Sequence, residues 1–299
     1  MQTLFLIGGS GFIGKHLARH LCGRYQIWVY DKYIDHAYFA SYPSIRTFEL
    51  DLASAPLPAS AVRPDYIVNL ASIVTAERDL SLFDALVTSN LKILLNLYDR
   101  FKNEEGLKLF IQFGSAEEYG TEHAPFTEDT RESPNSPYAL VKQLTTQTAL
   151  MLHRNYGFPA MVVRPGNLFG PLQNPAKFLP YIVSRLKTGI ALEVSPSEQK
   201  RDFIYIDDFC GAIDALLQHA AGCVGEIVNV SSGESLSLKS IIEYCKEELH
   251  SASPVHYGAL PYRENEAMNL SCSIEKLTRL TGFTLPFDTY QRLKDYLNQ

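Results

Sequence analysis

Two side chains one helical turn apart carry the groups needed for acid/base chemistry. Tyr138 and Lys142 are four residues apart in a segment whose pattern predicts a helix, so they share one of its faces. A neighbouring ammonium favours the phenolate, so we expect Lys142 to lower the pKa of Tyr138 towards neutrality. Such a phenol is suited to move the proton of a carbinol hydroxyl. This spacing is common by chance, so other residues must support the assignment.

A serine is expected beside this pair. Ser115 follows the predicted strand 109–113 at its carboxyl end, the edge where ligands bind in open parallel sheets. Its hydroxyl can hydrogen-bond the substrate oxygen that gains or loses the proton. We therefore predict that Ser115, Tyr138 and Lys142 are catalytic.

Glycines cluster in the turn after the first predicted strand. The sequence Gly8-Gly-Ser-Gly-Phe-Ile-Gly14 opens the first predicted helix. Glycine allows a tight turn and a close approach to a pyrophosphate, and the helix N-terminus supplies free N–H donors. The predicted cofactor contacts in this loop are Gly8, Gly11, Phe12, Ile13 and Gly14. A purely structural turn is the alternative.

An acidic residue ends the second predicted strand. Asp31 lies twenty residues after Gly11, where a carboxylate can accept hydrogen bonds from the adenosine ribose. It would repel a 2′-phosphate, which favours NAD over NADP. Lys32 would soften that preference, so NADP stays open. A carboxylate that only faces solvent is the alternative.

The elements that must position these residues alternate along the chain. Continuous apolar runs predict buried parallel strands, and the amphipathic segments between them predict helices. The expected strands are 4–7, 27–30, 47–50, 66–70, 109–113, 161–163 and 227–230. The expected helices are 12–21, 80–101, 137–156, 178–187, 207–220, 238–249, 274–281 and 290–297. This alternation predicts an α/β fold of the Rossmann type, a doubly wound parallel sheet with helices on both faces.

The rhythm changes after about residue 165, where prolines interrupt the pattern. We predict an NAD(P)-binding domain over 1–165, to which about 202–232 returns. Residues 166–299 are predicted to form mainly a smaller C-terminal substrate-binding part.

Composition excludes several classes of protein. The chain has 299 residues and a net charge of −6 without long runs of one sign, so we expect no nucleic-acid partner. Its five cysteines form no CxxC pair, and its histidines show no ligand spacing, so we expect neither a disulfide framework nor a metal site. We expect no signal peptide, no membrane span and a cytoplasmic location.

The motifs together resemble the extended short-chain dehydrogenases, the epimerase/dehydratase family of nucleotide-sugar enzymes. The matching segments, in order, are Gly8-Gly-Ser-Gly-Phe-Ile-Gly14, Asp51-Leu52, Asn69-Leu-Ala-Ser72, Asn90, Gly114-Ser-Ala-Glu-Glu-Tyr-Gly120, Pro137-Tyr-Ala-Leu-Val-Lys142, Arg164-Pro-Gly-Asn-Leu-Phe-Gly-Pro171, Arg201-Asp-Phe-Ile-Tyr-Ile-Asp-Asp208 and Arg263-x-x-Glu266. The chain departs from the family pattern at Asn69, which stands for the usual histidine, and at Val141, which replaces the usual serine.

The resemblance implies further site residues. As cofactor contacts it adds Asp51, Leu52, Leu70, Ala71, Ser72, Asn90, Tyr138, Lys142 and Pro165. As substrate contacts it implies Ser115, Glu117, Asn167, Lys177, Arg201, Arg263 and Glu266. In the family pattern Pro165 approaches the nicotinamide, Asn167 and the arginines contact phosphate, and Glu266 contacts ribose. Two alternatives remain: a surface pair of Arg201 with Asp202 or Asp207, and a solvated charged stretch around Arg263.

The resemblance implies hydride transfer at a sugar carbon, usually C4. A 4,6-dehydratase needs an Asp-Glu pair after Ser115, and here the pair is Ala116-Glu117, which argues against it. A decarboxylase would need a basic clamp that we cannot identify. Segments 177–182, 198–204 and 263–268 resemble CDP-abequose synthase-type 4-keto-6-deoxyhexose reductases.

We therefore expect NAD(P)H-dependent reduction of a nucleotide-4-keto-6-deoxyhexose, a step of carbohydrate biosynthesis. The alternative is an NAD-dependent nucleotide-sugar 4-epimerase, which Asp31 favours. A non-catalytic NAD-binding regulator would be expected to lack Tyr138 or Lys142. The resemblance also implies a homodimer through helices 80–101 and 137–156.

Overall fold

The computed structural model describes residues 1–58, 62–121 and 123–299. Its centre is a parallel sheet with the strand order β11-β6-β5-β4-β1-β2-β3. The strands are β1 (Thr3–Ile7), β2 (Gln26–Asp31), β3 (Arg46–Glu49), β4 (Tyr66–Asn69), β5 (Leu109–Phe113), β6 (Ala160–Pro165) and β11 (Ile227–Val230). The predicted Rossmann fold is confirmed.

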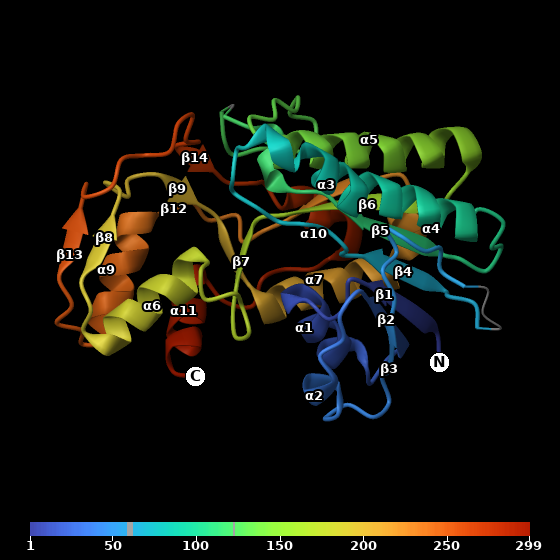
Figure 1. Cartoon of the computed structure of the whole chain (residues 1–299), viewed down its shortest axis with the longest axis horizontal. Coiled ribbons are helices and arrows are strands. Elements are labelled where there is room, and N and C mark those ends of the chain that lie inside the picture. Colours follow the sequence, from blue (N-terminus) through green and yellow to red (C-terminus); the bar gives the residue numbers. More distant parts are fainter. Residues whose placement is uncertain (59–61, 122) are drawn as a thin grey trace.

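The sheet has an apolar core on each face. Successive residues of a strand point to opposite faces, so Leu4 and Leu6 join one cluster and Phe5 and Ile7 the other. Figure 1 shows α3, α4 and α5 on one side and α1, α2 and α7 on the other. These helices are α1 (Phe12–Leu21), α2 (His36–Phe39), α3 (Phe83–Val87), α4 (Ile93–Phe101), α5 (Pro137–Tyr156) and α7 (Ile206–Gln218).

A smaller lobe lies beside the carboxyl edge of the sheet (Figure 1). Its helices are α6 (Phe178–Thr188), α9 (Leu238–Glu248) and α11 (Thr289–Leu297). The remaining short elements are β7 (Asn167–Phe169), β8 (Leu192–Val194), β9 (Lys200–Arg201), β10 (Phe203–Tyr205), α8 (Ala220–Cys223), β12 (Leu236–Ser237), β13 (Val255–Tyr257), β14 (Asn269–Leu270) and α10 (Glu275–Thr281). Sequence patterns missed these short strands because two or three residues show no alternation, and their partners lie far away in the chain.

The prediction of one continuous α-helix over Leu80–Phe101 is wrong, because the hydrogen-bonding pattern changes along this segment. It begins as a 3₁₀ turn, η1 (Leu80–Leu82), and a π turn, η2 (Thr88–Lys92), separates α3 from α4. Asn90 lies within the π turn and is buried. By length and apolar composition, Leu80–Phe101 also passes as a membrane-spanning segment, the one such helix among the residues described.

Two leucines of α5 face outward. Leu140 and Leu144 are 45% and 42% exposed, whereas Tyr138, Lys142 and Thr146 on another face are buried. Leu95 of α4 is exposed as well. The two helices that cover this side of the sheet therefore leave an apolar surface uncovered in the single chain.

Candidate active site

The predicted site residues come from segments that end at the carboxyl edge of the sheet. The strand order reverses between β1 and β4, which opens a crevice at this edge in doubly wound folds. The glycine loop follows β1, Asp31 ends β2, and Ser115 follows β5.

The glycines of the loop have different roles. Gly8 has a φ of +72°, and a Cβ there would lie 2.7 Å from the backbone nitrogen of Ala71. A Cβ on Gly14 would lie 2.4 Å from the Cα of Gly9, so packing of the turn requires both glycines. At Gly11 the nearest described atom would be the Gly8 carbonyl oxygen, at an ordinary 3.6 Å. The fold itself therefore leaves the surface at Gly11 open.

The start of α1 fits an anionic ligand. Gly11 is the N-cap, and no side chain among the described residues caps this end of the helix. Phe12 and Ile13 form the first turn, partly buried. Uncapped N–H groups beside an open glycine surface are what a pyrophosphate requires.

The acidic residue of β2 is tied to the same loop. The backbone N–H of Ser10 donates to Asp31 Oδ2 at 2.8 Å, which holds the carboxylate beside the glycines. Lys32 turns away, with its Nζ 3.8 Å from Asp51 Oδ2. The structure therefore does not pair Lys32 with Asp31.

The other predicted cofactor residues lie around the crevice. The N–H of Leu70 donates to the Ile7 carbonyl at 2.8 Å, which places Ala71 and Ser72 directly beyond β4. Leu52 is buried, and its carbonyl accepts a bond from Asn96 Nδ2 at 2.9 Å. Pro165 ends β6 opposite Val230.

Asn90 offers an unused acceptor. Its Nδ2 donates to the Leu86 carbonyl at 2.9 Å and to Ser89 Oγ at 3.1 Å. Its buried Oδ1 has no partner among the described residues. An unpartnered buried polar atom is costly and often marks a functional position.

The predicted catalytic residues meet below the carboxyl end of β5. The Ser115 side chain lies near the Tyr138 phenol and lowers the pKa of that phenol. Lys142 Nζ lies 5.8 Å from the centre of the Tyr138 ring and donates to the Phe113 carbonyl at 3.0 Å. All three side chains are buried.

The expected lowering of the Tyr138 pKa is wrong for this structure. Burial raises the pKa of Tyr138 well above its usual value, and the nearby carboxylates of Glu117 and Glu118 raise it further. The Ser115 side chain opposes this rise by stabilising the phenolate. Burial also lowers the pKa of Lys142 to about 8, because the charged ammonium loses its water.

Four cations act electrostatically on the carboxylate of Glu117. Burial raises the pKa of Glu117, and these cations, which stabilise its ionised form, oppose the rise. They are Lys177, Arg201, Arg78 and Arg263. Sequence reasoning missed Arg78, which lies in an irregular segment after β4 with no motif to mark it.

An ion pair joins a predicted phosphate contact, Arg201, to the predicted ribose contact, Glu266. Arg201 pairs with Glu266 and also donates to the Ala267 carbonyl at 2.7 Å. The alternative pairing of Arg201 with Asp202 is wrong, because buried Asp202 instead accepts bonds from Ser232. Asn167 lies next to this group, with its Nδ2 3.3 Å from the Asp202 carbonyl oxygen.

A second set of buried charges lies behind Ser115 and was also missed. Glu118 and Arg164 form an ion pair with both side chains fully buried, and Arg164 also pairs with Glu132. A signal was available, because Ser115-x-x-Glu118 is the spacing of a capping box. The structure forms that box at the 3₁₀ turn η3 (Ala116–Tyr119).

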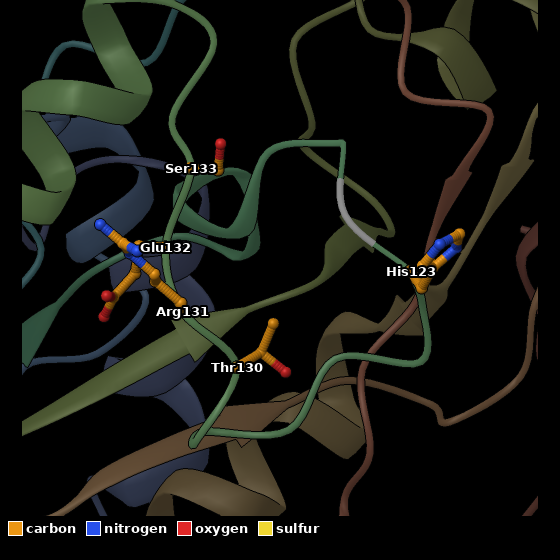
Figure 2. Close-up of a pocket in the computed structure, with 5 residues that line it drawn as sticks. All are labelled: His123, Thr130, Arg131, Glu132 and Ser133. Atoms are coloured by element: carbon orange, nitrogen blue, oxygen red, sulfur yellow. The ribbon is translucent and has the colours of Figure 1, made fainter.

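A cavity of about 530 Å³ lies in the loop before α5. Its lining residues are His123, Thr130, Arg131, Glu132 and Ser133. Figure 2 shows Arg131, Glu132 and Ser133 together and His123 across the cavity from them. None of its described lining residues belongs to the predicted site, and Glu132 pairs with Arg164.

Comparison with known proteins identifies the class of this chain. The model of the NAD dependent epimerase/dehydratase family matches residues 4–231. The chain therefore belongs to this family and is an enzyme of that class, which confirms the resemblance inferred from the motifs.

Relatives within the family differ in their reactions. The chain is 27% identical to the GDP-6-deoxy-D-mannose reductase of Pseudomonas aeruginosa, covering 99% of this chain and 96% of the relative. It is 32% identical to the CDP-abequose synthase of Salmonella muenchen over 46% of each chain. A dTDP-glucose 4,6-dehydratase from Streptomyces venezuelae, solved with NAD and TYD bound, superposes with a TM-score of 0.89. It is 26% identical and covers 99% of this chain and 96% of that structure.

Proposed function

We propose that this enzyme uses NAD(P)H to reduce a nucleotide-linked 4-keto-6-deoxyhexose. The observation that carries the proposal is the contact of Ser115 with Tyr138, above Lys142 and beside a carboxylate ringed by cations. This arrangement offers a proton donor and an anion-binding wall next to each other. Bound NADH would supply the hydride.

The residues at the carboxyl edge suit a dinucleotide. Gly8 and Gly14 shape the turn, and Gly11 with the uncapped start of α1 would receive the pyrophosphate. Asp31, held by the Ser10 N–H, would accept the ribose hydroxyls and favour NAD. The buried Asn90 Oδ1 could accept a further hydrogen bond, because it has no partner among the described residues.

The net charge of the proposed substrate-binding residues suits a diphosphate. The groups are the cations Arg78, Lys177, Arg201 and Arg263 and the carboxylates Glu117 and Glu266. Four cations less two carboxylates (4 − 2 = 2) leaves two positive charges for the anionic diphosphate. We propose that Asn167 joins them.

The chain's own residues then manage the proton. Tyr138 donates its phenolic proton to the sugar O4 while C4 receives the hydride, so the ketone becomes an alcohol. The Ser115 hydroxyl orients O4 and stabilises the phenolate that is left. The ammonium of Lys142, held by the Phe113 carbonyl, stabilises the same negative charge.

Ala116 favours reduction over dehydration. It occupies the position before Glu117, and its methyl side chain carries no acid. One relative that covers 99% of this chain is named as a reductase. The second candidate is a 4-epimerase, because Asp31 suits an enzyme that retains and recycles NAD.

We further propose a cytoplasmic homodimer. Leu140 and Leu144 of α5 and Leu95 of α4 are exposed on the face made by the two long helical segments. Apolar surface of this kind is covered in solution by a partner. We expect a second copy, rather than a membrane, to cover Leu80–Phe101.

The test is an assay of the purified protein with several nucleotide sugars, followed by the absorbance of the reduced cofactor. Stoichiometric consumption with a 4-keto-6-deoxy sugar supports the reductase. Conversion of a sugar without net consumption indicates the epimerase. Cofactor binding with no turnover of any sugar would contradict both and indicate a regulator.

A further inference from the structure

Glu118 is a fully buried carboxylate directly behind the predicted catalytic serine. Its Oε1 accepts the backbone N–H of Ser115 at 2.8 Å and the hydroxyl of Thr146 at 3.0 Å. Its Oε2 accepts a hydrogen bond from Arg164 Nε at 2.9 Å and lies 2.7 Å from Arg164 Nη2 in an ion pair. One carboxylate therefore ties together the end of β5, helix α5 and strand β6.

The site around Glu118 is built closely. A Cβ on Gly114 would lie 2.4 Å from Glu118 Oε1, so the carboxylate presses against the backbone of the residue before Ser115. The Arg164 guanidinium lies 4.5 Å above the Tyr119 ring. Burial raises the pKa of Glu118, and the Arg164 guanidinium with the bonds from Ser115 and Thr146 opposes that rise by stabilising the ionised form.

Resting on the proposed function, we propose that Glu118 is a positioning residue, which Arg164 holds in place so that it fixes Ser115 against Tyr138. Glu118 does not touch the substrate in this role. It acts through the Ser115 backbone, and through Thr146, one turn after Lys142, on the helix that carries Tyr138 and Lys142.

Its charge also bears on the proton carriers. Glu118 raises the pKa of Tyr138, together with Glu117, and raises the pKa of Lys142. Removing the charge should lower both pKa values. Reduction requires Tyr138 as the protonated phenol and Lys142 as the ammonium. If both pKa values fall, each group loses its proton at a lower pH, so activity should also be lost at a lower pH.

Glu132 supplies a matched comparison. It pairs with the same guanidinium, its Oε1 2.6 Å from Arg164 Nη2, but it borders the outer cavity (Figure 2). It does not contact Ser115 and is not among the groups that shift the pKa of Tyr138 or Lys142. Glu118→Gln and Glu132→Gln thus each remove one carboxylate from Arg164, and only the first acts on the site.

The experiment measures thermal stability, kcat, KM and the alkaline limb of the kcat–pH profile in both variants. For Glu118→Gln we expect kcat to fall on the order of tenfold to a hundredfold with an unchanged KM. Its alkaline limb should move to lower pH by about one unit. Glu132→Gln should lower the thermal stability but leave the alkaline limb of the kcat–pH profile at its wild-type pH. If the alkaline limb of the kcat–pH profile moved equally in both variants, or moved in neither variant, the proposal would be overturned.

Glu118→Asp decides the matter if Glu118→Gln fails to fold. It keeps the charge but is one methylene too short to reach Ser115 and Arg164 together. A reduced kcat with an unmoved limb would support the positioning role, and an unchanged kcat would refute it. Tyr138→Phe separates the two proposals: if that variant retains full turnover, the proposed function fails, whatever Glu118 does.

Discussion

The two sides of the crevice offer different kinds of groups to their proposed ligands. The cofactor side uses backbone groups and glycines within short contiguous stretches, such as the Gly8–Gly14 turn and its bond to Asp31. The substrate side uses charged side chains from distant segments, with Arg78, Arg201 and Arg263 meeting at Glu117. The proposed dinucleotide site is therefore a local feature of the chain, whereas the proposed substrate site joins segments that are far apart in the sequence.

The largest expected effect is on the group that joins the two sides. Tyr138→Phe should lower kcat by about 10²–10⁴-fold, because the variant has no proton to give. Steady-state kinetics and a separate titration of NADH binding would check this, since the cofactor affinity should change little. Unchanged turnover would remove Tyr138 from the mechanism.

The glycines test the cofactor side. Gly14→Ala should destabilise the protein by a few kcal/mol, because its Cβ would meet Gly9 at 2.4 Å. Gly11→Ala has room at 3.6 Å and should keep its melting temperature while it loses NADH affinity. Equal loss of stability in the two variants would show that the whole loop is merely structural.

Lys142 gives a prediction about pH and stability. Its pKa falls from 10.5 to about 8 on folding, so charged Lys142 costs about 3 kcal/mol below pH 8. The unfolded lysine still holds its proton between pH 8 and 10.5, so that cost is relieved as pH rises through this window. Lys142→Met should therefore raise the free energy of unfolding at pH 7, and its advantage should shrink above pH 8. Chemical denaturation at several pH values would check it; a constant difference would contradict the buried charge.

Arg201 tests the substrate side. Arg201→Met should raise KM for the nucleotide sugar about tenfold to a hundredfold, with a smaller effect on kcat, since a charge-assisted contact to the diphosphate is lost. Lys200→Met is the control, because Lys200 is an exposed neighbour in the same strand. An equal rise of KM in both variants would point to a diffuse charge effect instead.

The smallest expected effect is on cofactor choice. Asp31→Ala should narrow the preference for NADH over NADPH by about tenfold, because the repulsion of the 2′-phosphate is removed. The ratio of kcat/KM for the two cofactors measures it. An unchanged ratio would assign Asp31 only to the Ser10 contact.

The fold and the cofactor loop were predictable because continuous apolar strands and a contiguous glycine turn are local patterns. The meeting of Ser115 with Tyr138 followed from the rule that ligands bind at the carboxyl edge. Sequence patterns could not predict that Arg78 acts on Glu117, that Arg201 pairs with Glu266 or that Arg164 pairs with Glu118. Each of these interactions joins segments that are far apart in the chain. The exposed Leu140 and Leu144 of α5 show a further limit of sequence-based prediction. Periodicity cannot distinguish residues of the core from residues of a surface that another chain covers.

The most direct test of hydride transfer to C4 uses NADH labelled with deuterium at the transferred position. Wild-type enzyme is mixed with a nucleotide-linked 4-keto-6-deoxy sugar, and the product is analysed by NMR. The account predicts one deuterium at C4 of the product sugar for each cofactor oxidised. Product without deuterium at C4, or cofactor oxidised without a labelled sugar, would contradict it.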